Sequence, residues 1–210
     1  MSSWNVDLKA NVFGLSWVIL GVAIVFHSHL AVAGVPTDQV RGTIDRVLTI
    51  LQNPTLKSTD KRQERRDQLS KVISARFDFP EMARRSLGAE WRRLTPPQQE
   101  HFIELFTELL RNAYVADIES YKGEKVIYKR ETQEERFAVV QTIVRSPEGA
   151  EYSFDYRLHL VGNEWKVYDV VIENVSIVNN FRSQFARVIN RSSYDGLIRA
   201  LREKTLSKRN

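Results

Sequence analysis

The chain has 210 residues, a length typical of one domain or at most two small ones, and 42% of its residues are hydrophobic, which is enough to form a core. It contains no cysteine, so thiol catalysis, disulfide bonds and cysteine-ligated zinc are excluded. The net charge of +5 is unevenly spread, with 13 basic and seven acidic side chains in residues 41–93, nine and 15 in residues 94–181, and eight and two in residues 182–210.

Residues 1–33 have the pattern of a signal peptide. Residues 12–26 are almost wholly apolar, and Lys9 precedes them. Ala31-Val32-Ala33 then matches the small-x-small cleavage pattern, which predicts Gly34 as the first mature residue. The alternative is an uncleaved membrane anchor, although the apolar segment is short for a membrane span. In either case we expect residues 34–210 to be an exported single domain. Its basic segments would then meet anionic lipid or acidic proteins, with no nucleic acid partner, unless they are ordinary solvated helix faces.

Four helices are predicted first. Periodic apolar residues predict helices at 38–52 and from about 59 to 77. Asp78-Phe79-Pro80-Glu81 is a helix-start pattern, and it predicts a short helix that ends at Gly88. Thr95-Pro96-Pro97-Gln98 is a second such pattern, and it opens the longest predicted helix.

Strands are predicted in the second half of the chain. Residues 125–129 indicate a short strand, and residues 136–144 indicate a longer one with apolar groups on both faces. Residues 152–160 alternate between apolar and polar side chains, which predicts one buried and one solvated face. Helices followed by strands indicate an α+β fold: a curved antiparallel sheet of about four strands, packed by N-terminal and C-terminal helices.

Residues 165–185 join the fourth strand directly to an amphipathic helix. Trp165 to Ile172 is rich in aromatic and β-branched residues on both faces, and such a strand is usually covered on both sides. From Phe181 the apolar residues recur at helical spacing. A last helix is predicted to start near Ser193.

The run W-K-V-Y-D-V-x-I-E-x-V-S-I-V-x-N-F-R-x-Q-F at residues 165–185 resembles the signature of the MlaC family. Further matches are F-D-F-P-E-M-A from residue 77, the aromatic residues of the long helix, and the closing Leu197-Ile198 with Leu201. Members of this family, also called toluene-tolerance auxiliary proteins, are periplasmic phospholipid carriers of Gram-negative bacteria. The resemblance implies a sheet-and-helix shell that encloses an apolar cavity for acyl chains.

Few residues offer chemistry. After residue 33 the chain has two histidines, and it has no H-x-x-x-H pair, glycine-rich phosphate loop or G-x-S-x-G motif. The best acid–base candidate for a small hydrolase or isomerase combines Asp155 and His159 on one strand with Asp169 on the next. We expect these side chains to be solvated, and we predict no catalytic site, no metal and no cofactor.

Apolar cargo would need a wall of aliphatic and aromatic side chains, although a solid core accounts for the same pattern. The candidates for lipid contact are Phe79, Met82, Leu87, Phe102, Phe106, Leu109, Tyr114, Val140, Phe154, Tyr156, Val170, Ile172, Val175 and Phe181. The candidates for partner docking are Arg84, Arg85, Arg92, Arg93, Arg182 and Arg187.

The resemblance implies a carrier that shuttles phospholipid between an inner-membrane ABC transporter complex and an outer-membrane lipoprotein complex, and so maintains outer-membrane lipid asymmetry. Phospholipid would be its cargo rather than a cofactor. The alternative is an exported protein-interaction module with a solid core that binds a partner through its basic helices.

Overall fold

Helices and strands are segregated along the chain. The computed structural model describes residues 34–206, so the predicted signal peptide and its cleavage site lie outside the described residues. Four helices come first and one follows the sheet: α1 (Val35–Gln52), α2 (Arg62–Arg76), α3 (Phe79–Leu87), α4 (Pro96–Glu119) and α5 (Ile177–Leu206). Single-turn 3₁₀ helices, η1 (Pro54–Leu56), η2 (Thr59–Lys61) and η3 (Glu90–Arg93), lie in the connections. None of the helices in this described part is long and apolar enough to cross a membrane.

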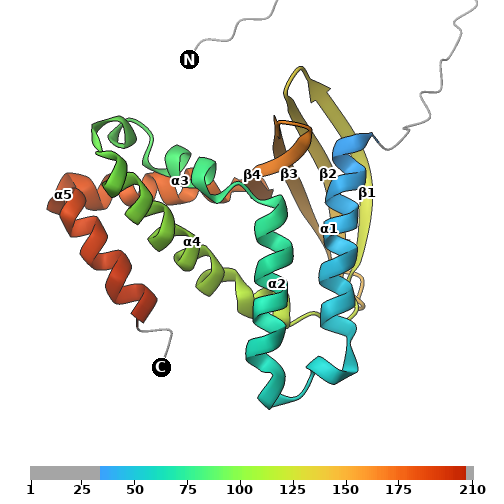
Figure 1. Ribbon diagram of the computed structural model, residues 1–210. Helices are drawn as coiled ribbons and strands as arrows, with labels where there is room; N and C mark the ends of the chain where they lie inside the picture. Colours follow the sequence, from blue (N-terminus) through green and yellow to red (C-terminus); the bar gives the residue numbers. More distant parts are fainter. Residues whose placement is uncertain (1–33, 207–210) are drawn as a thin grey trace, which may run out of the picture. The chain divides into compact units, whose positions relative to one another are not determined.

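The strands form an antiparallel meander. In spatial order they are β1 (Lys125–Glu134), β2 (Phe137–Arg145), β3 (Glu151–Val161), β4 (Glu164–Ile172) and β5 (Val175–Ser176). This confirms the α+β prediction of a curved antiparallel sheet, with a two-residue fifth strand added (Figure 1). The prediction of a short first strand is wrong, because β1 continues to Glu134. The polar residues at its end need no buried face, since an edge strand is held by its backbone pairing.

The helix-start patterns act as predicted. Asp78 caps α3 by accepting a hydrogen bond from the Glu81 amide at 3.0 Å, and Gly88 ends the helix with a positive φ of 58°. At the start of α4, the Thr95 amide donates to the Gln98 side chain at 2.9 Å. Local chemistry therefore sets the ends of both helices.

One face of the sheet, called the inner face here, carries α1. Val40 of α1 packs with buried residues of β2, β3 and β4, and α2 lies beside α1 (Figure 1). The buried residues of this cluster are Val40, Ala138, Val140, Leu158, Trp165, Val167 and Val170.

A second cluster joins α3, α4 and α5. Phe106 lies at its centre, with its ring centroid 5.9 Å from that of Phe102, 5.6 Å from Phe181 and 6.0 Å from Phe185. Helix α5 bends at Ser193, whose φ of 68° and ψ of 174° are not helical. The predicted start of a last helix near Ser193 coincides with this bend. The segment beyond it packs on α4 through Leu197 and Leu201.

The opposite, outer face of the sheet corrects one expectation. We predicted a solvated Asp169, but only 3% of this residue is exposed. Its carboxylate accepts hydrogen bonds from the Ser176 hydroxyl at 2.6 Å and the Val178 amide at 3.1 Å, and it pairs with Arg157 at 3.2 Å. Alternation of side chains along the strand could not reveal this, because the start of α5 folds back over β4 and covers the carboxylate.

Candidate functional site

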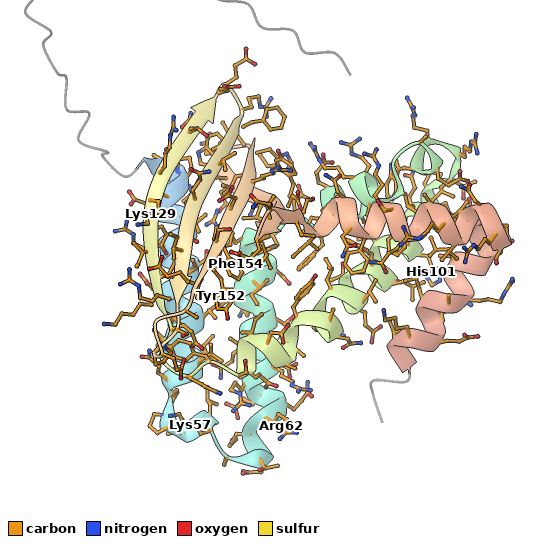
Figure 2. The ribbon with its side chains drawn as sticks, turned by 180° about the vertical axis from the view of Figure 1, so that it is seen from behind. Lys57, Arg62, His101, Lys129, Tyr152 and Phe154 are labelled. Carbon is orange, nitrogen blue, oxygen red and sulfur yellow. The ribbon has the colours of Figure 1, made fainter. Side chains whose placement is uncertain are left out.

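Exposure of the inner face increases along β3 from Leu158 toward the β2–β3 turn. Strand register places its residues in rows across the sheet, and in the row Ala138–Leu158–Val167 no residue is more than 3% exposed. Two rows further along β3, Phe154 is half-buried, and at the next inner-face position Tyr152 is 49% exposed. Both residues are labelled in Figure 2. The inner face is thus closed around Leu158 and opens along β3 toward the β2–β3 turn.

The row in the middle of this gradient, called the inner-face row here, runs across four strands. Tyr128 pairs with Thr142, Thr142 with Phe154, and Phe154 with Ile172. Its two rings and Ile172 are half-buried, and they pack against the inner cluster. The Thr142 hydroxyl donates to the Phe154 carbonyl at 3.0 Å, so this row presents an almost wholly apolar surface.

Two tyrosines of this region lie in a strongly desolvated environment. Burial, with a smaller contribution from Asp45, raises the pKa of Tyr128 to about 12, and Arg41 opposes this increase. Burial also raises the pKa of Tyr156, which stands one row deeper, and the neighbouring Tyr128 contributes to the increase. Tyr156 nevertheless keeps accessible surface. The Tyr156 side chain is thus half-buried in an apolar part of the inner face.

The helices that accompany this face also carry half-buried apolar residues. Ile44 of α1 packs against the inner cluster, and Val47, Leu48 and Leu51 further along α1 remain half-buried. The same holds for Val72 and Ile73 of α2. The apolar stripes predicted from helical spacing are therefore only partly covered at the open end of the inner face.

An ion-pair network joins α2 to the end of α4. Arg65 and Arg66 both pair with Glu119, at 2.9 and 2.8 Å. Desolvation would raise the pKa of Glu119, but the hydrogen bonds from Arg66 and Arg65 outweigh it and lower the pKa below its usual value. Arg65 also donates to the Leu56 carbonyl at 3.0 Å. The network therefore holds three helical segments together beside the half-buried residues of α2.

The predicted lipid-contact residues fall into three groups. Val140 and Val170 are buried in the inner cluster, and Phe154, Tyr156 and Ile172 lie half-buried against it. The α3, α4 and α5 candidates belong to the helical cluster, where Phe102 and Phe106 have no exposed surface, and Val175 lies apart with 57% of its surface exposed. The helical group consists of Phe79, Met82, Leu87, Phe102, Phe106, Leu109, Tyr114 and Phe181.

Tyr128 was not among the candidates, although the sequence carries a signal for it. Val126 and Tyr128 share one face of the predicted strand, and apolar Ile127 lies between them on the other face. The predicted strand was too short for its alternation to be used. A bulge between Tyr128 and Arg130, which sequence does not reveal, then shifts the register of the remainder.

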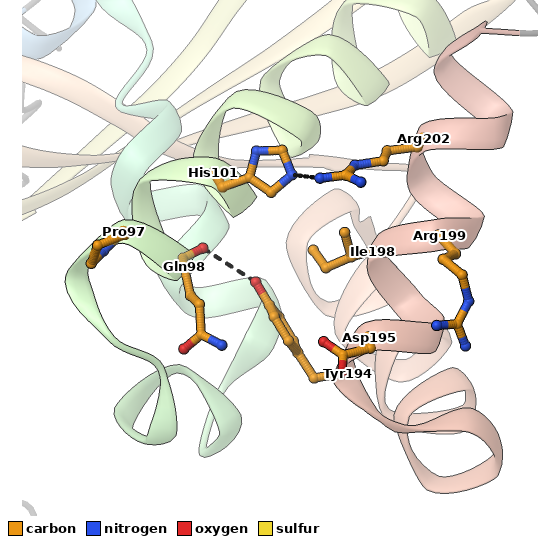
Figure 3. Close-up of a pocket in the computed structure, with 8 residues that line it drawn as sticks. All are labelled: Pro97, Gln98, His101, Tyr194, Asp195, Ile198, Arg199 and Arg202. Carbon is orange, nitrogen blue, oxygen red and sulfur yellow. Dashed lines mark hydrogen bonds between the residues drawn. The ribbon is translucent and has the colours of Figure 1, made fainter.

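The expected enclosed apolar cavity is not seen within residues 34–206. A hollow of about 410 Å³ does open between the start of α4 and the last part of α5, but no residue of the sheet contributes to it. Tyr194 donates there to the Gln98 carbonyl at 3.2 Å, and His101 and Arg202 are 2.8 Å apart (Figure 3). Its other lining residues are Pro97, Asp195, Ile198 and Arg199, a mixed polar set that does not suit acyl chains.

The predicted docking arginines gather around α3 and α5. Arg84 and Arg85 pair with Glu81 at 2.6 and 2.7 Å, and Arg85 also lies over the Tyr168 ring at 4.0 Å. Arg182 of α5 lies close to Gly88, where an added Cβ would be 2.7 Å from its Nε. The three others, Arg92, Arg93 and Arg187, are exposed.

The acid–base candidates are not assembled into one site. His159 lies 2.9 Å from the Asp78 carboxylate, which caps α3, and Asp169 is bonded to β5 and α5. Asp155 is 3.4 Å from Gln141. Each group thus has its own structural partner. The described part of the chain also has no cluster of three or more His, Asp or Glu side chains suited to a metal ion.

Comparison with known proteins links this arrangement to one family. The family model described as "MlaC protein" matches residues 41–203. A toluene tolerance protein, ttg2D, of Pseudomonas putida is 26% identical over 165 residues, which cover 78% of this chain and 77% of that protein. The intermembrane phospholipid transport system binding protein MlaC of Haemophilus influenzae is 24% identical over 122 residues, 56% of this chain and 57% of that protein.

A solved structure has the same fold. The phospholipid-binding protein from Ralstonia solanacearum, determined in complex with a phospholipid, aligns with a TM-score of 0.73 and 28% sequence identity. The alignment covers 84% of this chain and all of that one.

Proposed function

The chain belongs to the MlaC family, and from this membership we propose that it is a periplasmic phospholipid carrier. The observation that carries the proposal is the half-buried apolar surface that opens along the inner face, in a fold shared with a protein solved in complex with phospholipid. Residues 34–210 would act as one lipid-binding domain after removal of residues 1–33.

The energetics of acyl chains explain why a deep apolar recess is needed. Burying one methylene contributes about 0.8 kcal/mol, so exposing a chain of about sixteen carbons costs on the order of 10 kcal/mol. A shallow groove that covered half of each acyl chain would leave the other half in contact with water, and a large part of this free-energy cost would remain. The inner-face row and the neighbouring Tyr156 offer apolar surface, and bound tails would separate α1 and α2 from the sheet at the open end.

We propose that lipid is exchanged with an inner-membrane ABC transporter complex and an outer-membrane lipoprotein complex, and that this exchange maintains outer-membrane lipid asymmetry. The arginines around α3 and α5 are the proposed docking residues, because exposed cations favour brief contacts with acidic surfaces. No reactive group is required for such exchange, since the lipid is transferred without a covalent step.

One observation favours the alternative of a protein-interaction module. The helical cluster is filled, with Phe102 and Phe106 fully buried, and the exposed arginines lie beside it. Such a module would bind its partner through α3 and α5 and would carry no lipid.

Native mass spectrometry of the purified protein separates the two functions. A carrier should appear with an added mass of one or more phospholipids, and organic-solvent extraction should recover the same species. We expect the bound lipids to have headgroup proportions close to those of the cell, because the inner-face row has few polar groups that could distinguish one headgroup from another. Protein that is wholly lipid-free, and stays so after incubation with vesicles of cellular phospholipid, would favour the interaction module.

A further inference from the structure

The Tyr128 hydroxyl is a buried polar group whose bonding capacity is unused. It has no hydrogen-bond partner among residues 34–206, and it is shielded from water. Its ring packs against the inner cluster, and the Arg41 guanidinium lies 4.6 Å from the ring centroid on the α1 side. Buried hydroxyls are nearly always bonded in native proteins, and leaving one unbonded is unfavourable. The protein therefore holds a donor ready for a group from outside.

The position of this hydroxyl points to the cargo. Tyr128 stands at one end of the inner-face row, and the other hydroxyl of that row, on Thr142, is already engaged by the Phe154 carbonyl. Phe154 and Ile172 supply only apolar surface. Tyr128 is thus the unbonded donor of the inner-face row, where acyl chains would lie.

The chemistry of a lipid restricts what could accept this hydrogen bond. Methylene chains have no acceptor, and a charged headgroup is strongly unfavourable in an apolar environment. The ester carbonyl at the head of each acyl chain is an uncharged acceptor next to apolar chain. Because burial raises the pKa of Tyr128 to about 12, the phenol stays protonated at neutral pH and keeps the O–H that can donate to this carbonyl.

We propose that the Tyr128 hydroxyl donates a hydrogen bond to an ester carbonyl of the bound lipid, so that the protein selects acyl-ester lipids over ether-linked lipids. This inference rests on the proposed carrier function and adds a specificity-determining residue to it. An ether oxygen is a weaker acceptor that lies within the chain, and it cannot replace the carbonyl.

The test is a competition between two lipids. The delipidated protein is offered equal amounts of dipalmitoyl phosphatidylglycerol and its dihexadecyl ether analogue, and native mass spectrometry measures the bound ratio. Wild type should prefer the ester lipid by about two- to tenfold, the range expected for one neutral hydrogen bond. Tyr128→Phe should bring the ratio to about one, while the matched control Tyr152→Phe, an exposed phenol of the same face, should keep the wild-type ratio.

A second measurement separates ligand binding from folding. Lipid-free Tyr128→Phe should melt at or above the wild-type temperature, because the change removes an unbonded buried hydroxyl. A clearly lower melting temperature would identify a structural hydroxyl and overturn the inference. So would equal binding of both lipids by wild type, or an ester preference retained by the variant. Failure of wild type to bind either lipid would instead overturn the carrier function itself, and the inference with it.

Discussion

At the residue scale, the buried carboxylate of Asp169 organises the junction between the sheet and α5. It accepts from the Ser176 hydroxyl and the Val178 amide, and it pairs with Arg157 of β3. A charged side chain is stable in a buried position when its oxygens are bonded in this way. Asp169 therefore acts as the N-terminal cap of α5 from a neighbouring strand, which accounts for its burial without any catalytic role.

Replacement of Asp169 should reveal this role. Asp169→Ala leaves a buried hydroxyl and an amide without their acceptor, and we expect a loss of about 2–3 kcal/mol in the free energy of unfolding. Urea denaturation of the lipid-free protein measures it. The matched control is Asp155→Ala on the same face, whose single contact with Gln141 is 3.4 Å long. Equal urea midpoints for the two variants would contradict the capping role.

At the element scale, α4 and β3 present two kinds of apolar surface. Phe106 of α4 is enclosed by three other phenylalanine rings and has no exposed surface. Phe154 of β3 is half-buried in the inner-face row. Both were candidates for the same lipid wall, yet their surroundings differ. The first side chain stabilises the fold, and the second is the one that we propose contacts the lipid.

A pair of matched truncations distinguishes these roles. Phe106→Ala should destabilise the protein by about 3–5 kcal/mol, because it leaves a cavity in a closed core. Phe154→Ala should cost less stability, since part of its surface is already accessible, and should lower the amount of lipid that co-purifies. Thermal melting and lipid quantification by mass spectrometry give the two readouts. Full lipid occupancy of folded Phe154→Ala would remove this residue from the lipid wall.

At the scale of the whole molecule, the fold brings basic residues from separate segments of the sequence into one region. Arg84 and Arg85 of α3, Arg92 and Arg93 of η3, and Arg182 of α5 come together because α3 packs on α5. Their availability differs: Arg84 and Arg85 share Glu81, whose pKa is lowered because their hydrogen bonds outweigh the effect of desolvation. Arg93 also pairs, with Glu90 at 3.0 Å, but its side chain is 77% exposed; with the exposed Arg92 it is the stronger candidate for contact with an acidic partner.

Charge reversal tests this surface. Arg92→Glu combined with Arg93→Glu should slow lipid transfer to the membrane complexes severalfold and leave bound lipid unchanged. Added salt should slow the wild type in the same way, because exposed charges are screened beyond about 10 Å at 0.1 M salt. The same double reversal at Lys129 and Arg130 on the edge strand β1 is the control. If both pairs behave alike, or if salt has no effect, docking depends on another surface.

Much of the architecture followed from local patterns in the sequence. The starts of α3 and α4 were recognisable because capping is a matter of a few adjacent residues, at Asp78 and Thr95. Alternation along residues 152–160 identified the apolar face of β3, because successive strand side chains point to opposite faces. The motif at residues 165–185 identified the family.

Only the tertiary structure decided which apolar residues are core and which remain accessible. Phe106 and Phe154 look alike in a hydrophobicity pattern. Periodicity indicates that a side chain is covered, but it does not indicate whether protein or bound lipid covers it. Asp169 and Tyr128 show the same limit for polar groups. The burial of Asp169 depends on the return of α5 over β4, and the unbonded hydroxyl of Tyr128 depends on strand register and on the packing of α1. Both are contacts between segments far apart in the chain, and local sequence carries no record of them.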